Sequence, residues 1–380
     1  MDVNPPVNQT ITPLKTDTTT YEILSQRQLI WRKFKRHRVA LLSFYALVAL
    51  YIIVLLAEFF APYGAFQRHS THLLSPPTPL RFVDDQGVFH LRPFVYKMSN
   101  ELDRATFQRA YVEDPSEKYF LQLFVRGEPY KLLGFIDSDI HLFGVEAPGL
   151  FLPFGTDSLG RDILSRLLLG ARTSLFVGLL GLAIGFVLGL FFGGISGYYG
   201  GTIDLFVQRL TEFLQSLPTL PLWMALAALV PAEWTPIQVY FGISSVLAII
   251  GWTSLARVIR GKLISLREED YVMAARLSGV SEASIITRHL LPGFMSYLIV
   301  YLTLAVPQMI IGETALSYLG LGIRAPAVSL GTLLQDAQNV QTVTLSPWLL
   351  IPGGMVILIV VAFNFLGDGL RDAADPYRHH

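Results

Sequence analysis

Long apolar runs, separated by short polar blocks, set the pattern from which the elements of this chain are predicted. A helix rises about 1.5 Å per residue, so about 20 apolar residues cross a hydrocarbon core of about 30 Å. Six runs reach about that length, at 39–57, 173–203, 205–230, 236–256, 294–312 and 348–366. The pattern predicts an all-α polytopic membrane protein with six transmembrane helices, the first over 39–61.

Small residues and prolines give two of these runs a special character. Every fourth residue from Gly181 to Gly197 is a glycine, a spacing that lets a second helix approach closely. Pro218 and Pro221 break the 205–230 run. Broken helices persist at membrane depth only where protein or a water-filled cavity satisfies the freed backbone groups. We therefore expect Pro218 and Pro221 to line a pathway.

Two polar residues of the fifth span are further candidates for the lining of that pathway. Gln308 lies within the 294–312 run, and Glu313 directly follows it. Ionisable groups at membrane depth are costly and usually face a partner or water. For Glu313, the ordinary alternative is a side chain that reaches the membrane interface.

Residues 62–171 form a long block of mixed charge, proline and aromatic residues. We expect an extracytoplasmic insertion between the first and second spans, with a small β-containing module. Two hairpins are predicted in it, one over 80–91 with its turn at 84–87 and one over 119–135 with its turn at 127–128.

The end of this block predicts an amphipathic helix that lies at the outer membrane surface. Its sequence is ILSRLLLGARTSL, directly after Asp162. The apolar positions fall on one face, while Asp162 and Arg166 lie four residues apart on the other.

The distribution of basic residues predicts the orientation of the chain. A cluster directly before the first span consists of Arg27, Arg32, Lys33, Lys35, Arg36 and Arg38. A second group, Arg257, Arg260 and Lys262, follows the fourth span. Both belong in the cytoplasm by the positive-inside rule, which makes residues 1–38 and 371–380 cytoplasmic tails. Binding of nucleic acid or anionic lipid is an alternative role for the first cluster.

A charged segment at 268–292 separates the fourth span from the fifth. Tyr271 to Leu277 is predicted as a short helix, and Gly279 suits a left-handed stop. Ser281 can act as the N-cap of a second helix. Pro292 is expected to end that helix.

Composition and motifs exclude several kinds of chemistry. Of the 380 residues, 52% are hydrophobic and 15% are charged, the formal net charge is zero and cysteine is absent. Disulfides and thiol nucleophiles are therefore ruled out. Gly261-Lys262 lacks the remaining residues of a phosphate-binding loop. His69 and His72 have no third ligand at a recognisable spacing. We predict no catalytic residue, no metal site and no enzyme activity.

Three stretches together resemble one family of membrane proteins. The first is the 268–292 segment, where Ala274-Ala275 and Gly279 resemble the cytoplasmic "EAA" loop of ABC importer permeases. The second is GTDSLGRDILSRLLLGARTSL, which begins at Gly155, and the third is FNFLGDGLRDAADPY, which begins at Phe363. Their order is similar to that in permeases of the dipeptide and oligopeptide ABC importer family, in the second of its two permease types.

The resemblance implies the architecture of a type I ABC importer permease, with a transport domain at 172–370 and a coupling loop at 262–292. It implies contact with ATPase subunits through Glu269, Tyr271, Ala274, Ala275, Gly279, Ile286, Leu291 and Pro292. Met273 departs from the motif, because it stands where the name-giving Glu is expected.

The resemblance also implies partners and a location. The partners are a second permease subunit, two cytoplasmic ATP-binding subunits, an extracytoplasmic solute-binding protein and membrane lipid, with no role for nucleic acid. ATP and Mg²⁺ belong to the ATPase subunits, and this chain binds no cofactor. The expected location is a bacterial plasma (inner) membrane.

Other functions and cargoes stay open at this stage. A stand-alone channel or ion-coupled carrier is the main alternative, and a membrane scaffold is a third. The cargo can be a peptide, nickel, a sugar or another solute.

Overall fold

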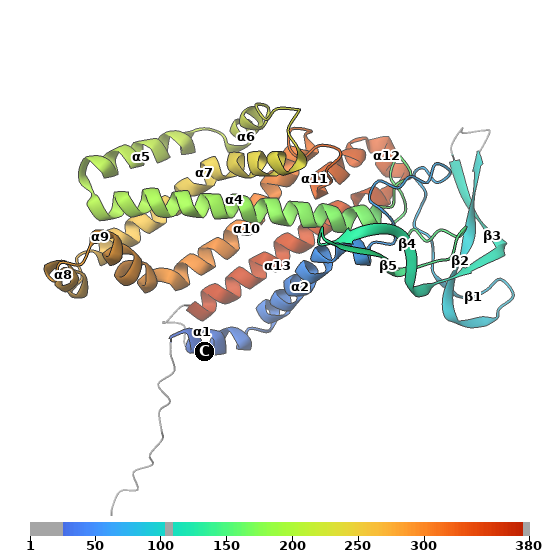
Figure 1. The fold of residues 1–380 in the computed structure, drawn as a ribbon, viewed down its shortest axis with the longest axis horizontal. Coiled ribbons are helices and arrows are strands. Elements are labelled where there is room, and N and C mark those ends of the chain that lie inside the picture. Colours follow the sequence, from blue (N-terminus) through green and yellow to red (C-terminus); the bar gives the residue numbers. More distant parts are fainter. Residues whose placement is uncertain (1–25, 103–108, 375–380) are drawn as a thin grey trace, which may run out of the picture.

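The computed structural model describes residues 26–102 and 109–374. Long helices form a bundle, and a β-rich part lies at one end of it (Figure 1). Within the described residues, five helical stretches are long and apolar enough to cross a membrane. They are Arg38–Leu55, Ile163–Tyr199, Pro236–Leu266, Glu282–Tyr318 and Pro347–Ala374. Parts of the predicted tails, 1–25 and 375–380, lie outside the described residues.

The helices follow one another in a simple order. They are α1 (Gln26–Arg36), α2 (Arg38–Leu55), α3 (Ala57–Phe60), α4 (Ile163–Tyr199), α5 (Gly201–Ser216), α6 (Thr219–Ala227), α7 (Pro236–Leu266), α8 (Asp270–Leu277), α9 (Glu282–Ser284), α10 (Met295–Tyr318), α11 (Leu330–Leu333), α12 (Val340–Leu345) and α13 (Ile351–Ala374). A π-helical turn, Ile285–Leu290, and a 3-10 turn, Leu291–Phe294, join α9 to α10. Two more 3-10 turns, Leu334–Gln338 and Pro347–Leu350, flank α12.

The third predicted span, 205–230, is not one long helix. It consists of α5 and α6, which are separated at Leu217 and Pro218. Pro218 has extended backbone and precedes α6, while Pro221 lies in the first turn of that helix. The break has a direct cause, because proline disfavours helical backbone in the residue before it.

The second predicted span is longer than its apolar run. A single helix, α4, covers 163–199, so the separate surface helix predicted from the sequence is wrong. No proline or strong breaker interrupts this stretch. Arg166 is buried and pairs with Asp157 instead of facing water.

Two predicted helix ends in the later spans are also wrong. Glu313 does not end the fifth span, because α10 continues to Tyr318. Pro292 does not stop the preceding helix either. It occupies the first turn of the 3-10 segment, where the missing proline N–H costs no hydrogen bond.

Glycines on α4 bring its backbone against α7. A Cβ added at Gly189 would lie 2.8 Å from Leu255, and one at Gly197 would lie 2.9 Å from the Cα of Arg260. The close approach of another helix, expected from the spacing of these glycines, is confirmed. Near the C-terminal end of α4, the guanidinium of Arg260, on α7, donates to the carboxylate of Asp204, on α5, at 2.5 Å and 2.6 Å.

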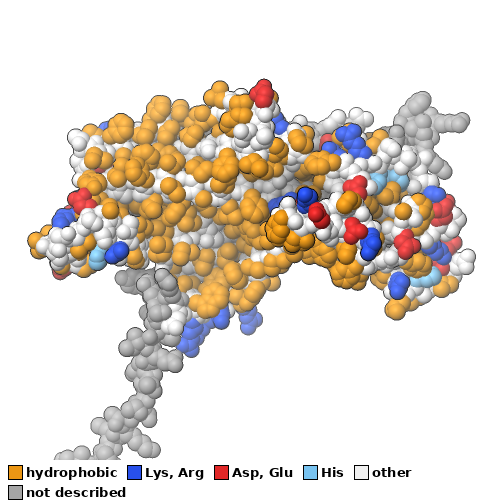
Figure 2. Space-filling model, viewed as in Figure 1, with side chains coloured by type: hydrophobic (Ala, Val, Ile, Leu, Met, Phe, Trp, Pro, Cys, Tyr) orange, Lys and Arg blue, Asp and Glu red, His pale blue; other side chains and the backbone are white. Residues whose placement is uncertain are grey.

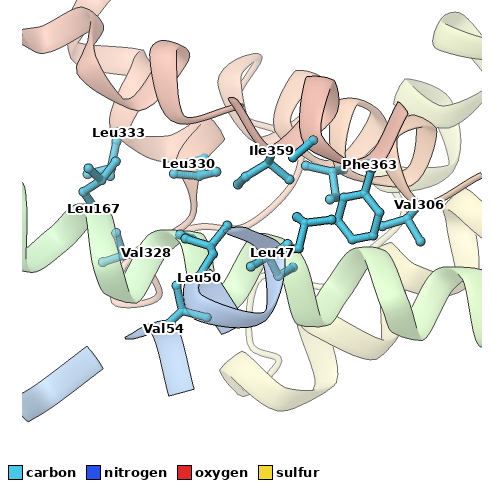
Figure 3. Close-up of a cluster of buried hydrophobic side chains, with 14 residues drawn as sticks. Leu47, Leu50, Val54, Leu167, Val306, Val328, Leu330, Leu333, Ile359 and Phe363 are labelled. Carbon is cyan, nitrogen blue, oxygen red and sulfur yellow. The ribbon is translucent and has the colours of Figure 1, made fainter. Parts of the chain in front are cut away.

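A buried apolar cluster joins the other spans (Figure 3). Leu47, Leu50 and Val54 of α2 pack in one cluster with a group from α4, α10, α11, α13 and the loop before α11. The labelled members of that group are Leu167, Val306, Val328, Leu330, Leu333, Ile359 and Phe363. Because the alternative contact for these side chains is largely lipid rather than water, close packing between them is what stabilises this part of the bundle.

The β-rich part contains two sheets. One has the order β1 (Arg81–Val83), β2 (Phe89–Leu102), β3 (Arg109–Phe120), and the other pairs β4 (Gln122–Leu132) with β5 (Ile136–Gly144). The predicted turn at 84–87 joins β1 to β2. The predicted turn at 127–128 is wrong, because these residues lie inside β4 at an irregular register, and the chain turns at Leu133–Gly134.

The glycine contact between α4 and α7 leads to a stability prediction. A Cβ at Gly193 would lie 2.5 Å from the carbonyl oxygen of Ala256, whereas one at Gly194 meets no atom within 4 Å. Gly193→Ala is therefore expected to destabilise the protein by about 1–3 kcal/mol. Gly194→Ala should leave stability unchanged or raise it by about 0.5–1 kcal/mol. Unfolding midpoints in one detergent measure both, and equal shifts would contradict the packing described.

Candidate functional site

The 268–292 segment lies at the end of the bundle away from the β-rich part (Figure 1). It begins with α8, which runs from Asp270 and ends before Gly279. Gly279 has φ +76°, a left-handed conformation, and a Cβ there would meet no atom within 4 Å. Glycine is thus needed for its backbone conformation rather than for space. The left-handed stop predicted at this position is confirmed.

The underside of the segment is buried in an apolar cluster. Val272, Ile285 and Leu290 have no exposed surface. They pack with Ile259 and Leu263 of α7, Phe294 of the 3-10 turn and Leu298 of α10. The segment is therefore fixed to the two helices that it connects.

Two tyrosines attach the segment to α4 as well. The guanidinium of Arg276, on α8, lies 5.5 Å from the centre of the Tyr198 ring. The Tyr199 hydroxyl donates to a carboxylate oxygen of Glu282, on α9, at 2.7 Å. Three long helices thus contact this short segment, which can pass a displacement to all of them.

The outer face of α8 is open and carries apolar side chains beside the exposed Asp270. Leu277 is 86% exposed, and Tyr271 and Met273 are 45% and 44% exposed. Ala274 lies on the same face and is also exposed. A small residue between larger apolar ones lets a partner surface approach the helix backbone.

The other residues predicted to contact the ATPase subunits differ in how far they are buried. Glu269 is exposed and precedes α8 without a capping bond from its side chain. Pro292 is exposed, Ala275 and Ile286 are half-buried, and Leu291 is buried. The structure places all of them in one segment, with Leu291 in its core rather than on its surface.

The four residues predicted to line a pathway do not gather at one place. Pro218, Pro221 and Gln308 are exposed on the surface of this chain. Glu313 has no exposed surface. Its carboxylate accepts hydrogen bonds from Ser174 of α4 at 2.6 Å and from Ser317 at 2.7 Å. In this conformation Glu313 joins α10 to α4 through Ser174.

Sequence reasoning missed the contacts made by Tyr198, Tyr199, Arg276 and Glu282. The pair Tyr198-Tyr199 stands at the end of the glycine face, directly before Gly200. Aromatic residues at the end of a span are common at membrane interfaces, so the pattern did not distinguish lipid contacts from contacts with a loop.

The comparison with known families covers most of the helical part. The profile described as "Binding-protein-dependent transport system inner membrane component" matches residues 185–379, just over half of the chain. A second profile, "N-terminal TM domain of oligopeptide transport permease C", matches residues 25–77.

The chain belongs to the family of inner-membrane components of binding-protein-dependent transport systems. This family consists of transport permeases rather than enzymes. The likeness to dipeptide and oligopeptide ABC permeases inferred from the sequence is confirmed, and so is a polytopic membrane fold of that kind.

Several curated relatives are similar over long stretches. The oligopeptide transport system permease protein OppC of Bacillus subtilis is 38% identical over 59% of this chain and 71% of its own length. The dipeptide transport system permease protein DppC of Bacillus subtilis is 41% identical over 59% of this chain and 68% of its own length. DppC of Lactococcus lactis is 31% identical over 93% of this chain and 91% of its own length.

Solved structures of ABC transporters are similar to part of this chain. An inward-facing structure of the MetNI methionine ABC transporter has a TM-score of 0.42 at 18% identity and covers 55% of this chain and 95% of its own. An amino acid ABC transporter with histidines has a TM-score of 0.41 at 19% identity, over 53% and 91%.

The tyrosine contacts lead to a prediction about the order of the 268–292 segment. Tyr198→Leu removes a buried ring and its contact with Arg276, so exchange of backbone amides in 270–291 should become faster. Tyr199→Phe removes only an exposed hydrogen bond and should change exchange little. Hydrogen–deuterium exchange of the purified permease measures both. Equal protection in the two variants would show that Tyr198 does not hold the segment.

The Glu313 contacts lead to a second prediction. Glu313→Leu leaves the Ser174 and Ser317 hydroxyls without their acceptor, at a cost of about 1–3 kcal/mol. Glu313→Gln keeps an acceptor and should cost less. Unfolding midpoints in detergent compare the two variants. A Glu313→Leu protein of normal stability that no longer transports would assign this residue to the pathway instead.

Proposed function

We propose that this chain is the membrane-spanning permease subunit of an ATP-driven importer of di- or oligopeptides and forms half of the translocation pathway. The names of its relatives support this cargo, since OppC and DppC are oligopeptide and dipeptide permeases. The alternative cargoes, nickel and sugars, have no such support in these names.

The observation that carries the proposal is the form of the 268–292 segment. Its underside is fixed to α7, α10 and the end of α4, while α8 presents the exposed apolar side chains of Tyr271, Met273 and Leu277. Such a helix suits a groove on another protein. We assign that groove to an ATP-binding subunit, because the sequence contains no phosphate-binding loop of its own.

The complete transporter then needs further subunits. We propose a second permease, two cytoplasmic ATP-binding subunits that hold ATP and Mg²⁺, and an extracytoplasmic solute-binding protein. The chain is a multi-pass protein of a bacterial inner membrane with both termini cytoplasmic, and the 62–171 block lies outside. The helices α5 and α6 together form one interrupted crossing, in addition to the five continuous ones.

The mechanism follows from the attachment of the 268–292 segment. Closure of the ATP-binding subunits moves α8, and the buried cluster transfers that movement to α7 and α10. A full shift from 1:99 to 99:1 between inward- and outward-facing states requires a differential binding energy of about 5.5 kcal/mol. ATP and loaded solute-binding protein supply that energy jointly, because each binds one state better than the other.

The test compares a substitution at Gly279, which follows α8, with one at Gly261, near the end of α7. Gly279→Leu forces a side chain into left-handed backbone and should cost about 1–2 kcal/mol in the native turn. The affinity for the ATP-binding subunits should then fall about tenfold. Gly261→Leu is the matched control, because its Cβ also meets no atom within 4 Å but its backbone is helical. The measurement is co-purification from membranes with both variants at equal expression.

Transport is the second arm of the test. The four-subunit complex in liposomes should take up a labelled tripeptide only with ATP and solute-binding protein present, and Gly279→Leu should slow that uptake. Uptake by this chain alone, without nucleotide, would instead identify a channel or carrier and overturn the proposal.

A further inference from the structure

Both sheets of the β-rich part expose apolar side chains, and the β4–β5 hairpin has six large ones. These are Leu123, Phe124, Leu133, Phe135, Ile136 and Ile140, and Phe135 is 73% exposed. Its turn, with positive φ at Leu133 and Gly134, lies between apolar residues. Residues 133–135 form this turn, because Leu132 pairs with Ile136, and turns in water are usually rich in Gly, Asn, Asp, Ser and Pro. Contiguous exposed apolar side chains of this kind mark a surface that a membrane or another protein covers.

The hairpin is attached to the end of the first membrane helix. The ring of Phe124 lies 6.3 Å from that of Phe59, on α3. The ring nitrogen Nδ1 of His141, on β5, donates to the carbonyl oxygen of Ala61 at 2.5 Å. The other sheet, β1–β3, lies farther from the helices (Figure 1). The position of the hairpin along the bundle is therefore tied to α3.

The length of the helix before this attachment sets its depth. Phe59 follows Arg38, at the start of α2, by about 20 residues, which is about 30 Å of helix. That distance equals the thickness of a hydrocarbon core. With Arg38 at one boundary, Phe59 and its neighbour Phe124 lie at the other. Glu58, which pairs with Arg172 at 2.7 Å, marks the same boundary with charge.

The apolar surface is continuous at this point. In Figure 2 the hydrophobic flank of the helices reaches the region that Figure 1 labels β4 and β5, where charged side chains lie among the apolar ones. Aromatic side chains such as Phe124 and Phe135 suit the zone between headgroups and acyl chains. A protein partner in solution would reach the sheet β1–β3 more easily than a surface at this depth.

We propose that the β4–β5 hairpin is a membrane anchor, with Leu123, Phe124 and Phe135 inserted at the lipid interface of the leaflet at that end of the bundle. The anchor holds the β-rich part against the bilayer beside the helices. This role is independent of the cargo and of the ATP-binding subunits.

Site-directed spin labels can test the proposal directly, because the chain contains no cysteine. Single variants Leu123→Cys, Phe124→Cys and Phe135→Cys are labelled in the full chain, in complex with its partner subunits, in phospholipid nanodiscs. Leu42→Cys, on α2 and 71% exposed, is the lipid control. Leu91→Cys, on β2 and 88% exposed, is the water control. Collision rates with oxygen, which prefers lipid, and with a nickel chelate, which prefers water, are compared.

The expected result is that labels at 124 and 135 collide with oxygen more often than with the chelate, as the label at 42 does. The ratio should be reversed at position 91. The proposal is overturned if positions 124 and 135 resemble position 91. It is also overturned if they are shielded from both probes only when solute-binding protein is added, because a protein partner then covers the hairpin.

Discussion

The close approach of the α4 and α7 backbones is the constraint on which the rest of the bundle depends. In lipid, helices gain little from hiding apolar side chains, so packing between small residues supplies much of their association. The glycines from Gly181 to Gly197 allow that packing along the C-terminal half of α4. Because α7 leads directly into the 268–292 segment, the same contact also positions the candidate site. Fold and site thus share one interface.

Much of the helical part could be predicted, because membrane spans follow from length and hydrophobicity alone. The glycine spacing predicted a close neighbour for α4, and Gly279 predicted a left-handed turn. Helix ends were less predictable. Apolarity indicates where lipid is and not where a helix stops, so α4 begins ten residues before its charge-free run and α10 continues past Glu313. Glycine is typical of turns, but Gly127 lies inside β4, where the pairing with β5 shifts in register between Arg126 and Tyr130.

The candidate site was predictable in its segment and less so in its contacts. Small residues and a glycine identify the exposed 268–292 segment. Within it, however, Leu291 is buried, and the contact with Tyr198 comes from a helix far away in sequence. Contacts between distant segments leave no local signal. The residues predicted for the pathway illustrate a different limit. Pro218 and Gln308 lie on the surface of this chain, and a surface becomes a channel wall only when a second surface faces it.

The uninterrupted length of α4 has a mechanical consequence. At about 1.5 Å per residue its 37 residues form a rod of about 55 Å, well beyond the thickness of the hydrocarbon core. One end carries Tyr198 against α8, and the other begins at Asp162, beside the loop that Trp348 binds through Thr156. A continuous helix without proline lets a movement that begins at one end reach the other. A helix that tilts about a point within the bilayer moves its two ends in opposite directions.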